Sequence, residues 1–315
     1  MSSITNNSGA YRVSNSEIQT FKDCRRKWWL SYDRRLKPKN KRVSGPLALG
    51  SRIHNALEEF YENETDLIEA YMELVEKDKI VALTEGLNIE ELESEADMGR
   101  IMLEGYIQWL AEEGIDADYD IISNEQTLVM PIPIPGKNVE LQGKLDMRVR
   151  RKSDGTRLIR DFKTVGQSFD QFTSTLHLNE QVLTYLTLEA YHNTEDDRSD
   201  GAIFTLFKKN KQTARAKPPF YAQEEILHNV FTLRSFWFRL YGAIQDLMTV
   251  KEALENGEDH RLVAYPRPSG DCKWKCEFFS ICHMVDDGSD YEDAIADHFE
   301  VGNPNERYEE KKESE

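Results

Sequence analysis

The chain has 315 residues and a formal net charge of −17, with 39% hydrophobic and 31% charged residues. This length is ample for a buried core and fits one large domain or two. No run of about 18 apolar residues is available for a membrane span, and residues 1–10 lack the apolar centre of a signal peptide. We therefore expect a soluble, cytoplasmic protein that does not bind membranes and whose residues 1–10 are disordered.

Acidic charge is concentrated in two stretches of the chain. Residues 58–100 hold 15 acidic and 3 basic side chains, residues 286–315 hold 12 and 3, and the remainder is net positive at +4. Basic clusters occur at residues 25–27, 34–42, 148–152 and 208–217. A nucleic-acid channel lined by these clusters is compatible with the negative net charge. Each cluster taken alone is equally compatible with scattered, solvated charge.

The first third of the chain has helical patterns. Ser14-x-x-Glu17 has the form of a capping box that starts a helix reaching about Tyr32, with Cys24 inside it. A second helix has an apolar stripe from Leu49 to Tyr61, and His54 lies beside that stripe. Acidic helices are expected at residues 66–82 and 96–113. Residues 11–120 are therefore predicted to form a helical region.

From about Ile122 the apolar pattern changes to the period of two that is typical of strands. Residues 127–134, 139–149 and 157–163 predict an antiparallel meander. In the second of these strands the apolar residues fall on odd positions, so Asp146 lies on the opposite face. Asp161 and Lys163 are two residues apart in the third strand and share a face. Taken alone, this hairpin fits a solvated polar face as well as it fits an active site.

Further elements follow the meander. We predict a helix over residues 178–192, a strand over 202–207 and a long helix from Ala222 to about Leu254. The acidic residues 286–315 contain few large apolar groups, which predicts a disordered tail.

Four cysteines occur in the chain, at positions 24, 272, 276 and 282. Four thiolates with three clustered and one distant can complete a four-ligand site for an iron–sulfur cluster or for zinc. Two disulfides are disfavoured inside a cell, and unrelated free cysteines are the remaining alternative. A metal site would link the first helix to the C-terminal segment across about 250 residues.

Taken in order, the motifs resemble the RecB-like branch of the PD-(D/E)XK nuclease superfamily, specifically its iron–sulfur members related to the AddB nuclease domain and to CRISPR-associated RecB-like exonucleases. The motifs are Ser14-x-Ser16-x-Ile18-x-x-Phe21-x-x-Cys24, Gly50-Ser51-Arg52-Ile53-His54, Gly143-x-x-Asp146, Asp161-Phe162-Lys163-Thr164, Gln181-x-x-x-Tyr185 and the three clustered cysteines. They cover about residues 11–285. The chain departs from the family pattern at Arg25, where proline is frequent, and in the three residues between Cys272 and Cys276, where two are common.

The resemblance implies roles for individual residues. It assigns metal binding to His54, Asp146, Asp161 and the backbone carbonyl of Phe162, with Lys163 orienting water or neutralising charge. Carboxylate oxygens suit Mg²⁺ or Mn²⁺, and a single imidazole shifts the preference toward Mn²⁺.

Other polar residues have competing interpretations. Without the resemblance, His54 is better explained as a packed residue. Gln181 and Tyr185 are four residues apart on one helical face, which the resemblance places beside the active site and which is otherwise an ordinary polar patch. Glu125 is a candidate outer carboxylate, although a solvated strand-end charge is the simpler interpretation.

The resemblance implies an α/β fold with a restriction-endonuclease-like core, a mixed central sheet, flanking helices and an added N-terminal helical region. We expect one nuclease domain over residues 11–285, comprising the helical region at 11–120, a catalytic core at 121–210 and a C-terminal helix with the cysteine cluster at 211–285.

The expected activity is Mg²⁺- or Mn²⁺-dependent exonuclease cleavage of single-stranded DNA or DNA ends, supported by a 4Fe-4S cluster or zinc at Cys24, Cys272, Cys276 and Cys282. Recombination, repair or phage DNA processing in a bacterial or phage-infected cell would use such an activity, with a recombination or replication protein as partner. The alternative is a non-cutting, DNA-binding accessory protein that keeps the metal site for structure.

Overall fold

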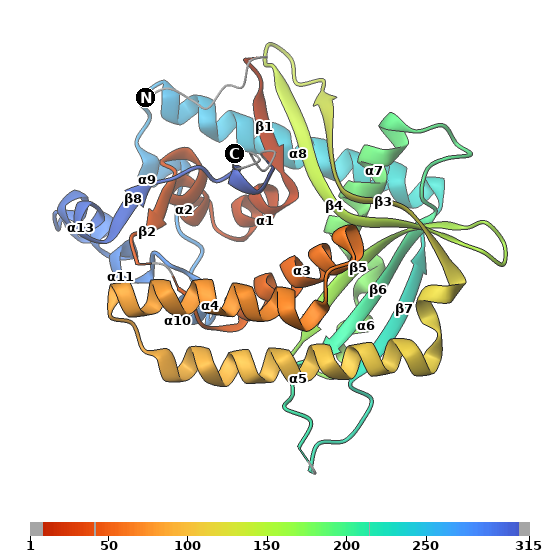
Figure 1. The fold of residues 1–315 in the computed structure, drawn as a ribbon. Coiled ribbons are helices and arrows are strands. Elements are labelled where there is room, and N and C mark those ends of the chain that lie inside the picture. Colours follow the sequence, from red (N-terminus) through yellow and green to blue (C-terminus); the bar gives the residue numbers. More distant parts are fainter. Residues whose placement is uncertain (1–8, 41, 214, 309–315) are drawn as a thin grey trace. The chain divides into compact units, whose positions relative to one another are not determined.

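The computed structural model describes residues 9–40, 42–213 and 215–308. They form two compact units, the first from residues 9–40, 129–143 and 234–308 and the second from residues 42–128, 144–213 and 215–233. Three elements, β3 (Tyr119–Ile132), β4 (Val139–Arg151) and α8 (Val230–Glu255), have residues in both units (Figure 1). Each unit is therefore built from segments that are distant in the sequence, and the prediction of one domain over residues 11–285 stays a prediction.

A mixed sheet is the centre of the second unit. β4 pairs antiparallel with β5 (Arg157–Val165), β5 pairs parallel with β6 (Gly201–Lys208), and β6 pairs antiparallel with β7 (Tyr221–Leu227). β3 pairs with β4. The predicted α/β class with a mixed central sheet is therefore confirmed.

Helices flank this sheet (Figure 1). α3 (Pro46–Asn63), α4 (Leu67–Glu85) and α5 (Ile89–Glu113) bury their apolar side chains against Met147, Phe162 and Phe207 of the strands. Side chains alternate along a strand, so Asp161 and Lys163 point to the face opposite Phe162. α7 (Glu180–His192) packs against β6 on that other face, and the short α6 (Phe169–Thr173) precedes it.

The N-terminal helical stretch of the first unit is broken at Cys24. After β1 (Tyr11–Ser14), α1 (Asn15–Asp23) begins as predicted, since the Ser14 hydroxyl accepts from the Glu17 amide at 3.3 Å. Cys24 is extended, with φ −161° and ψ 111°, and α2 (Arg25–Trp28) starts after it, followed by a π-helical turn at Trp29–Asp33. The prediction that Cys24 lies inside a helix is wrong, because its sulfur instead caps α2 by accepting from the Lys27 amide at 3.5 Å.

The acidic C-terminal stretch is ordered over much of its length. α13 (Tyr291–His298) leads into β8 (Phe299–Val301), which pairs antiparallel with β2 (Leu36–Pro38). Arg34 donates to both carboxylate oxygens of Glu292 at 2.9 and 2.7 Å. The disorder expected from residue 286 is therefore wrong for these elements, because composition does not report a backbone pairing with a distant strand. Residues 309–315, and residues 1–8 of the expected N-terminal disorder, lie outside the described part of the chain.

The predicted long helix begins eight residues later than expected. Residues 221–227 form β7, in which Tyr221 pairs with Phe207 and Glu225 with Ile203, and α8 begins at Val230. Pairing with β6 therefore overrides the local helical preference of this glutamate-containing stretch. The remaining elements are the 3-10 turns Ile115–Asp118, Leu176–Leu178 and Glu306–Tyr308 and the short helices α9 (His260–Val263), α10 (Cys272–Lys275), α11 (Phe279–Cys282) and α12 (Met284–Asp287).

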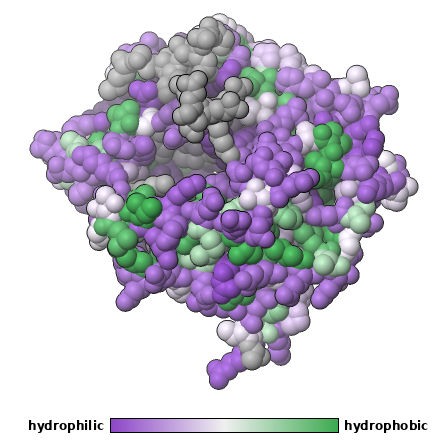
Figure 2. Space-filling view, in the orientation of Figure 1, coloured by the Kyte–Doolittle hydropathy of each residue, from purple (hydrophilic) through white to green (hydrophobic). Residues whose placement is uncertain are grey.

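The surface is mainly hydrophilic on the face that Figure 2 presents, with hydrophobic side chains in small scattered groups. Such scattered apolar side chains are normal for folded proteins. None of the helices in the described ranges is long and apolar enough to cross a membrane.

Candidate active site

Two carboxylates approach each other on the hairpin of β4 and β5. Met147 of β4 pairs with Arg160 of β5, and Asp146 and Asp161 are the next residues along the two strands. The side chain of Asp161 is almost fully buried, and burial is the main reason that its pKa is raised. The negative charge of Asp146 raises this pKa further, while Lys163 opposes the shift. Two mutually repelling carboxylates in one buried place favour the approach of a cation.

The ammonium of Lys163 connects this hairpin to α7. Its Nζ lies 3.0 Å from Oδ1 and 2.8 Å from Oδ2 of Asp161, and it donates to Oε1 of Gln181 at 3.1 Å. Gln181 then donates from Nε2 to the hydroxyl of Tyr185 at 2.9 Å. The helix is fixed at its start by Asn179, whose side chain accepts from the Val182 amide. The structure therefore brings the strand pair Asp161 and Lys163 together with the predicted helical pair.

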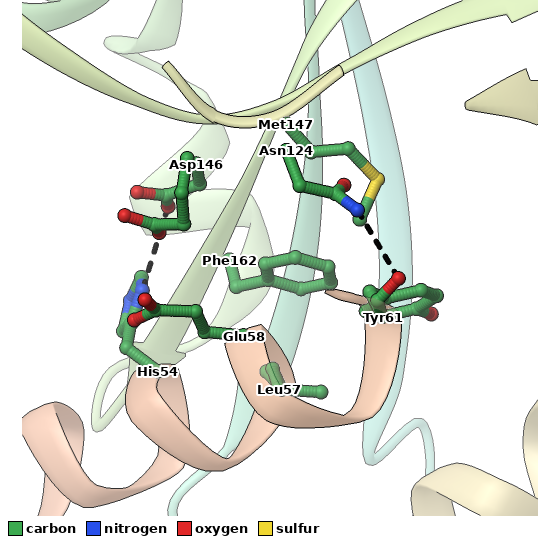
Figure 3. A pocket seen from close by; sticks show the side chains of 9 residues that line it. His54, Leu57, Glu58, Tyr61, Asn124, Asp146, Met147 and Phe162 are labelled. Atoms are coloured by element: carbon green, nitrogen blue, oxygen red, sulfur yellow. Dashed lines mark hydrogen bonds and ion pairs between the residues drawn. The ribbon is translucent and has the colours of Figure 1, made fainter. Parts of the chain in front are cut away.

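His54 extends the same site from α3. Its Nδ1 lies 3.4 Å from Oδ2 of Asp146 (Figure 3). Burial alone would lower the pKa of His54, but the hydrogen bond and negative charge of Asp146, together with the charge of Asp161, outweigh burial and raise it. His54 is thus aimed at the carboxylates, which is unlike a packed histidine among apolar neighbours.

Two further carboxylates lie beside Asp146. Glu58 is one helical turn after His54, and Figure 3 shows both side chains on the same side of α3. Lys144 forms an ion pair with Glu125 and lies 3.9 Å from Glu58. Glu58 and Glu125 line, together with His54 and Asp146, a cavity of about 20 Å³, enough for one water-sized group.

The expectation of a solvated Glu125 is wrong. Its side chain is only 17% exposed and its backbone is left-handed, with φ 44°, a conformation that is costly for a residue other than glycine. Sequence analysis also missed Glu58. The only signal was its spacing of four residues from His54, which gives little discrimination in a helix with several glutamates.

Phe162 separates Asp161 from Lys163 and points to the opposite face of β5. Its ring is buried and stacks with Tyr61 at 5.7 Å between ring centroids, under the guanidinium of Arg160. This packing fixes the strand that carries the candidate residues Asp161 and Lys163. Metal binding by the Phe162 carbonyl stays a prediction.

The four cysteines belong to the first unit and line one cavity of about 960 Å³. Backbone amides donate to two of the sulfurs, from Arg267 to Cys24 at 3.5 Å and from Ser269 to Cys272 at 3.3 Å. Burial raises the pKa of Cys282, and the nearby Cys24 thiol adds to that shift while Arg26 opposes it. Cys24 therefore lies close to the C-terminal cysteines despite its distance in sequence.

The sequence of residues 12–283 matches the family model of the PD-(D/E)XK nuclease superfamily. The chain belongs to this superfamily. Its match spans residues of both units, including every candidate site residue described above. Searches of curated proteins give no match.

A solved structure with a detectable likeness to this nuclease-superfamily chain is described as "Crystal structure of SSO0001". It shares 18% sequence identity, the alignment covers 75% of this chain and 84% of the other, and the TM-score is 0.32.

Members of the nuclease superfamily generally use Mg²⁺ or Mn²⁺. Within the described residues, no group of three or more His, Cys, Asp or Glu side chains lies in an arrangement that could hold a metal ion as it stands. Asp161 contacts Lys163, and Asp146 contacts His54. The donor set nevertheless fits a hard divalent cation, since it joins two carboxylates and one imidazole in a partly buried, mutually repelling arrangement.

Proposed function

We propose that this member of the nuclease superfamily is a metal-dependent exonuclease that hydrolyses phosphodiester bonds in single-stranded DNA or at DNA ends. The observation that carries the proposal is the continuous set of contacts from Asp161 through Lys163 and Gln181 to Tyr185, with His54 and Asp146 beside it. Acidic ligands and a positioned lysine on neighbouring strands are the equipment that hydrolysis of a phosphodiester needs. We further propose that both units together form one nuclease domain, because the family match spans both.

His54, Asp146 and Asp161 would hold the metal ion, with the Phe162 carbonyl as a further ligand. A bound Mg²⁺ or Mn²⁺ polarises the phosphate and makes water a stronger nucleophile. The chain itself supplies the ligand geometry. Packing of the Phe162 ring and pairing of the two strands fix Asp146 and Asp161 before substrate arrives.

Lys163 contributes positive charge where the transition state gains negative charge. Its ammonium carries three donors and no acceptor, and two of these are directed by Asp161 and Gln181. The remaining donor is available to an attacking water or a phosphate oxygen. Held in this way, the ammonium needs little reorganisation during the reaction, which is how a fixed charge accelerates it.

The proposal is tested with purified protein, end-labelled single-stranded DNA and Mn²⁺. Wild type should release labelled products, and Asp161→Asn, which keeps the size of the side chain, should lower the rate by at least about 100-fold. Asp196→Asn removes a charge from an exposed position and serves as the matched control, with unchanged cleavage expected. Absence of cleavage by wild type, or full cleavage by Asp161→Asn, would overturn the proposal in favour of a non-cutting, DNA-binding accessory protein.

Circular substrate separates the two modes of cutting. An exonuclease degrades a linear strand and leaves the closed circle of the same sequence intact, whereas an endonuclease opens both. Degradation from ends suits recombination, repair or phage DNA processing, in which a recombination or replication protein would supply the ends. Cleavage of circles at the rate of linear strands would contradict the exonuclease assignment.

We also propose that the chain belongs to the RecB-like iron–sulfur branch and that Cys24, Cys272, Cys276 and Cys282 hold a 4Fe-4S cluster. Support comes from the common cavity that the four cysteines line and from the amide donors at the sulfurs of Cys24 and Cys272. Hydrogen bonds to cysteine sulfur tune iron–sulfur clusters.

Anaerobic purification followed by iron and zinc analysis tests the cluster. About four iron atoms per chain with a broad visible absorption band are expected. Stoichiometric zinc without iron would replace the cluster with a structural zinc site. If the purified protein contains neither iron nor zinc, the proposed metal site is rejected.

A further inference from the structure

The segment around the C-terminal cysteines exposes aromatic rings to solvent. Trp274 is 76% exposed, whereas the other four tryptophans of the chain are buried or half-buried. Phe279 and Tyr265 are also about half exposed. Full burial of one such ring is worth roughly 1.5–3 kcal/mol, so these partly exposed rings forgo part of the stabilisation that full burial would give.

This exposure is not a failure of local packing. The neighbouring Phe278 is 1% exposed and stacks on Phe299 at 5.0 Å between ring centroids. The Trp274 amide donates to the Asp271 carbonyl at 3.0 Å, which holds the backbone of α10 in place. Phe278 therefore anchors the segment while Trp274 is presented outward from an ordered turn.

Cations accompany the exposed rings. Lys273 Nζ lies 5.7 Å from the centre of the Trp274 ring, and the guanidinium of Arg25 lies 5.2 Å from the centre of the Tyr265 ring. These distances fit cation–π contacts. We define the stacking surface as the three exposed rings and three accompanying cations. Its members are Tyr265, Trp274, Phe279, Arg25, Arg267 and Lys273, all within the first unit. Arg267 and Phe279 both line the cysteine cavity.

The cations of the stacking surface are available to a ligand. Two neighbouring lysines are neutralised, since Lys275 pairs with Asp271 at 2.8 Å and Lys27 with Glu277 at 3.2 Å. Within residues 9–40, 42–213 and 215–308, no carboxylate forms an ion pair with Arg25, Arg267 or Lys273. Residues 22–27 and 264–283 together hold seven basic and three acidic side chains, against a net charge of −17 for the whole chain.

We infer that the stacking surface binds a single nucleic-acid strand, with bases stacked on the exposed rings and phosphates beside the cations. This inference rests on the proposed function for the choice of DNA and extends it to a second contact region, made of residues other than those that would cut. Interleaved aromatic and basic side chains are the chemistry of sequence-tolerant binding to single strands. A surface for an apolar protein partner would instead have contiguous apolar side chains with charges at its rim.

Binding is measured by fluorescence anisotropy with a labelled oligothymidylate of about 20 nucleotides and the full chain in EDTA-free buffer with Ca²⁺ replacing the catalytic metal. Trp274→Ala should weaken binding about tenfold, in line with 1–3 kcal/mol per stacked base. Trp274→Phe should recover most of this loss. Phe238→Ala, which removes a 62% exposed ring on α8, is the matched control and should bind as wild type.

Two further readouts separate stacking from charge attraction. Trp274 is the exposed tryptophan, so bound strand should quench intrinsic fluorescence in wild type and much less in Trp274→Phe. A strand with abasic sites along its length offers phosphates without bases, and wild type and Trp274→Ala should bind it equally. Lys273→Gln should lower the slope of log affinity against log salt by about 0.7.

Failure of this inference differs from failure of the proposed function. Unchanged DNA binding by Trp274→Ala would overturn the stacking surface and leave an apolar partner protein as its ligand, even if wild type cuts DNA. Binding that depends on Trp274 in a protein that never cuts would retain the surface and reject the nuclease.

Discussion

Gln181 is the residue through which α7 reaches the catalytic lysine candidate. Gln181→Leu keeps the approximate volume but removes both of its hydrogen bonds, so Lys163 would remain held by Asp161 alone. We expect kcat to fall by about 10- to 100-fold with little change in KM, as for other residues that orient a reacting group. Gln181→Glu, which keeps an acceptor for the ammonium, should retain more activity. An increase in KM with unchanged kcat would show that Gln181 binds DNA and does not position Lys163.

Glu17 is buried inside the first unit and contributes to the pH dependence of stability. Burial raises its pKa from 4.5 to about 7, although hydrogen bonds from Tyr11 and Trp28 and the charge of Lys251 oppose the shift. Because the folded state holds this proton more tightly, its stabilising contribution is complete below about pH 4.5 and is lost as the pH rises to about 7. This contribution to the free energy of unfolding is about 3 kcal/mol.

Denaturant unfolding of wild type and Glu17→Gln at several pH values checks this expectation. The glutamine oxygen can accept the bonds from Tyr11 and Trp28, which both go to Oε1 of Glu17. Between pH 5 and pH 7.5, wild type should lose stability relative to Glu17→Gln. The exposed Glu258→Gln is the control and should follow wild type. Parallel pH profiles for all three proteins would contradict a proton bound at Glu17.

At the residue scale, the sequence predicted the relative placement of the candidate site residues better than it predicted their surroundings. Alternation along the strands placed Asp146 away from Met147, and the spacing of Asp161 and Lys163 placed them on a common face, as observed. The solvent exposure of Glu125 was predicted wrongly because its burial depends on Lys144 and on a left-handed backbone. No local sequence pattern predicts either feature. The contacts of His54 likewise require the meeting of α3 with β4.

At the scale of elements, α4 and α5 pack closely because Gly99 has no side chain. A Cβ at this position would collide with the hydroxyl of Tyr71, whose ring is fully buried. Gly99→Ala should therefore lower the free energy of unfolding by about 1–3 kcal/mol despite the better helix propensity of alanine.

Gly242→Ala is the matched comparison for Gly99→Ala in thermal unfolding. This glycine lies inside α8 with open space around its Cβ position, so alanine should stabilise the protein by up to about 1 kcal/mol. Combining Gly99→Ala with Tyr71→Leu should recover part of the loss. Equal changes in stability for Gly99→Ala and Gly242→Ala would show that helix propensity alone determines the effect of alanine and that the contact with Tyr71 does not matter.

Elements whose own residues show a clear hydrophobic periodicity were predictable, and strands that form by pairing with a distant strand were not. α3 and α7 follow from their apolar spacing. β7 forms by pairing with β6, and β8 forms by pairing with β2. A short stretch of sequence does not contain both strands of either pair. The helix break at Cys24 similarly reflects the use of its sulfur, which accepts from Lys27 and Arg267.

For the whole molecule, the proposed cluster would join chain segments about 250 residues apart. Its removal should therefore lower the melting temperature by far more than a surface substitution does. Anaerobic protein treated with an iron chelator and an oxidant, followed by circular dichroism and iron analysis, measures this. Cys276→Ser should reproduce the loss, whereas Ser280→Ala, an exposed neighbour, should not. An unchanged melting temperature after complete loss of iron would show that the cluster does not stabilise the fold by joining distant segments of the chain.

The antiparallel pair of β2 and β8 has a practical consequence for shortened forms of the protein. A gene trimmed at the start of the acidic stretch would remove β8 and leave the backbone donors and acceptors of β2 open, together with the face of Phe278 that Phe299 covers. Open strand edges and uncovered rings promote aggregation. Affinity tags and truncations are therefore better placed after Tyr308, where they spare this closure.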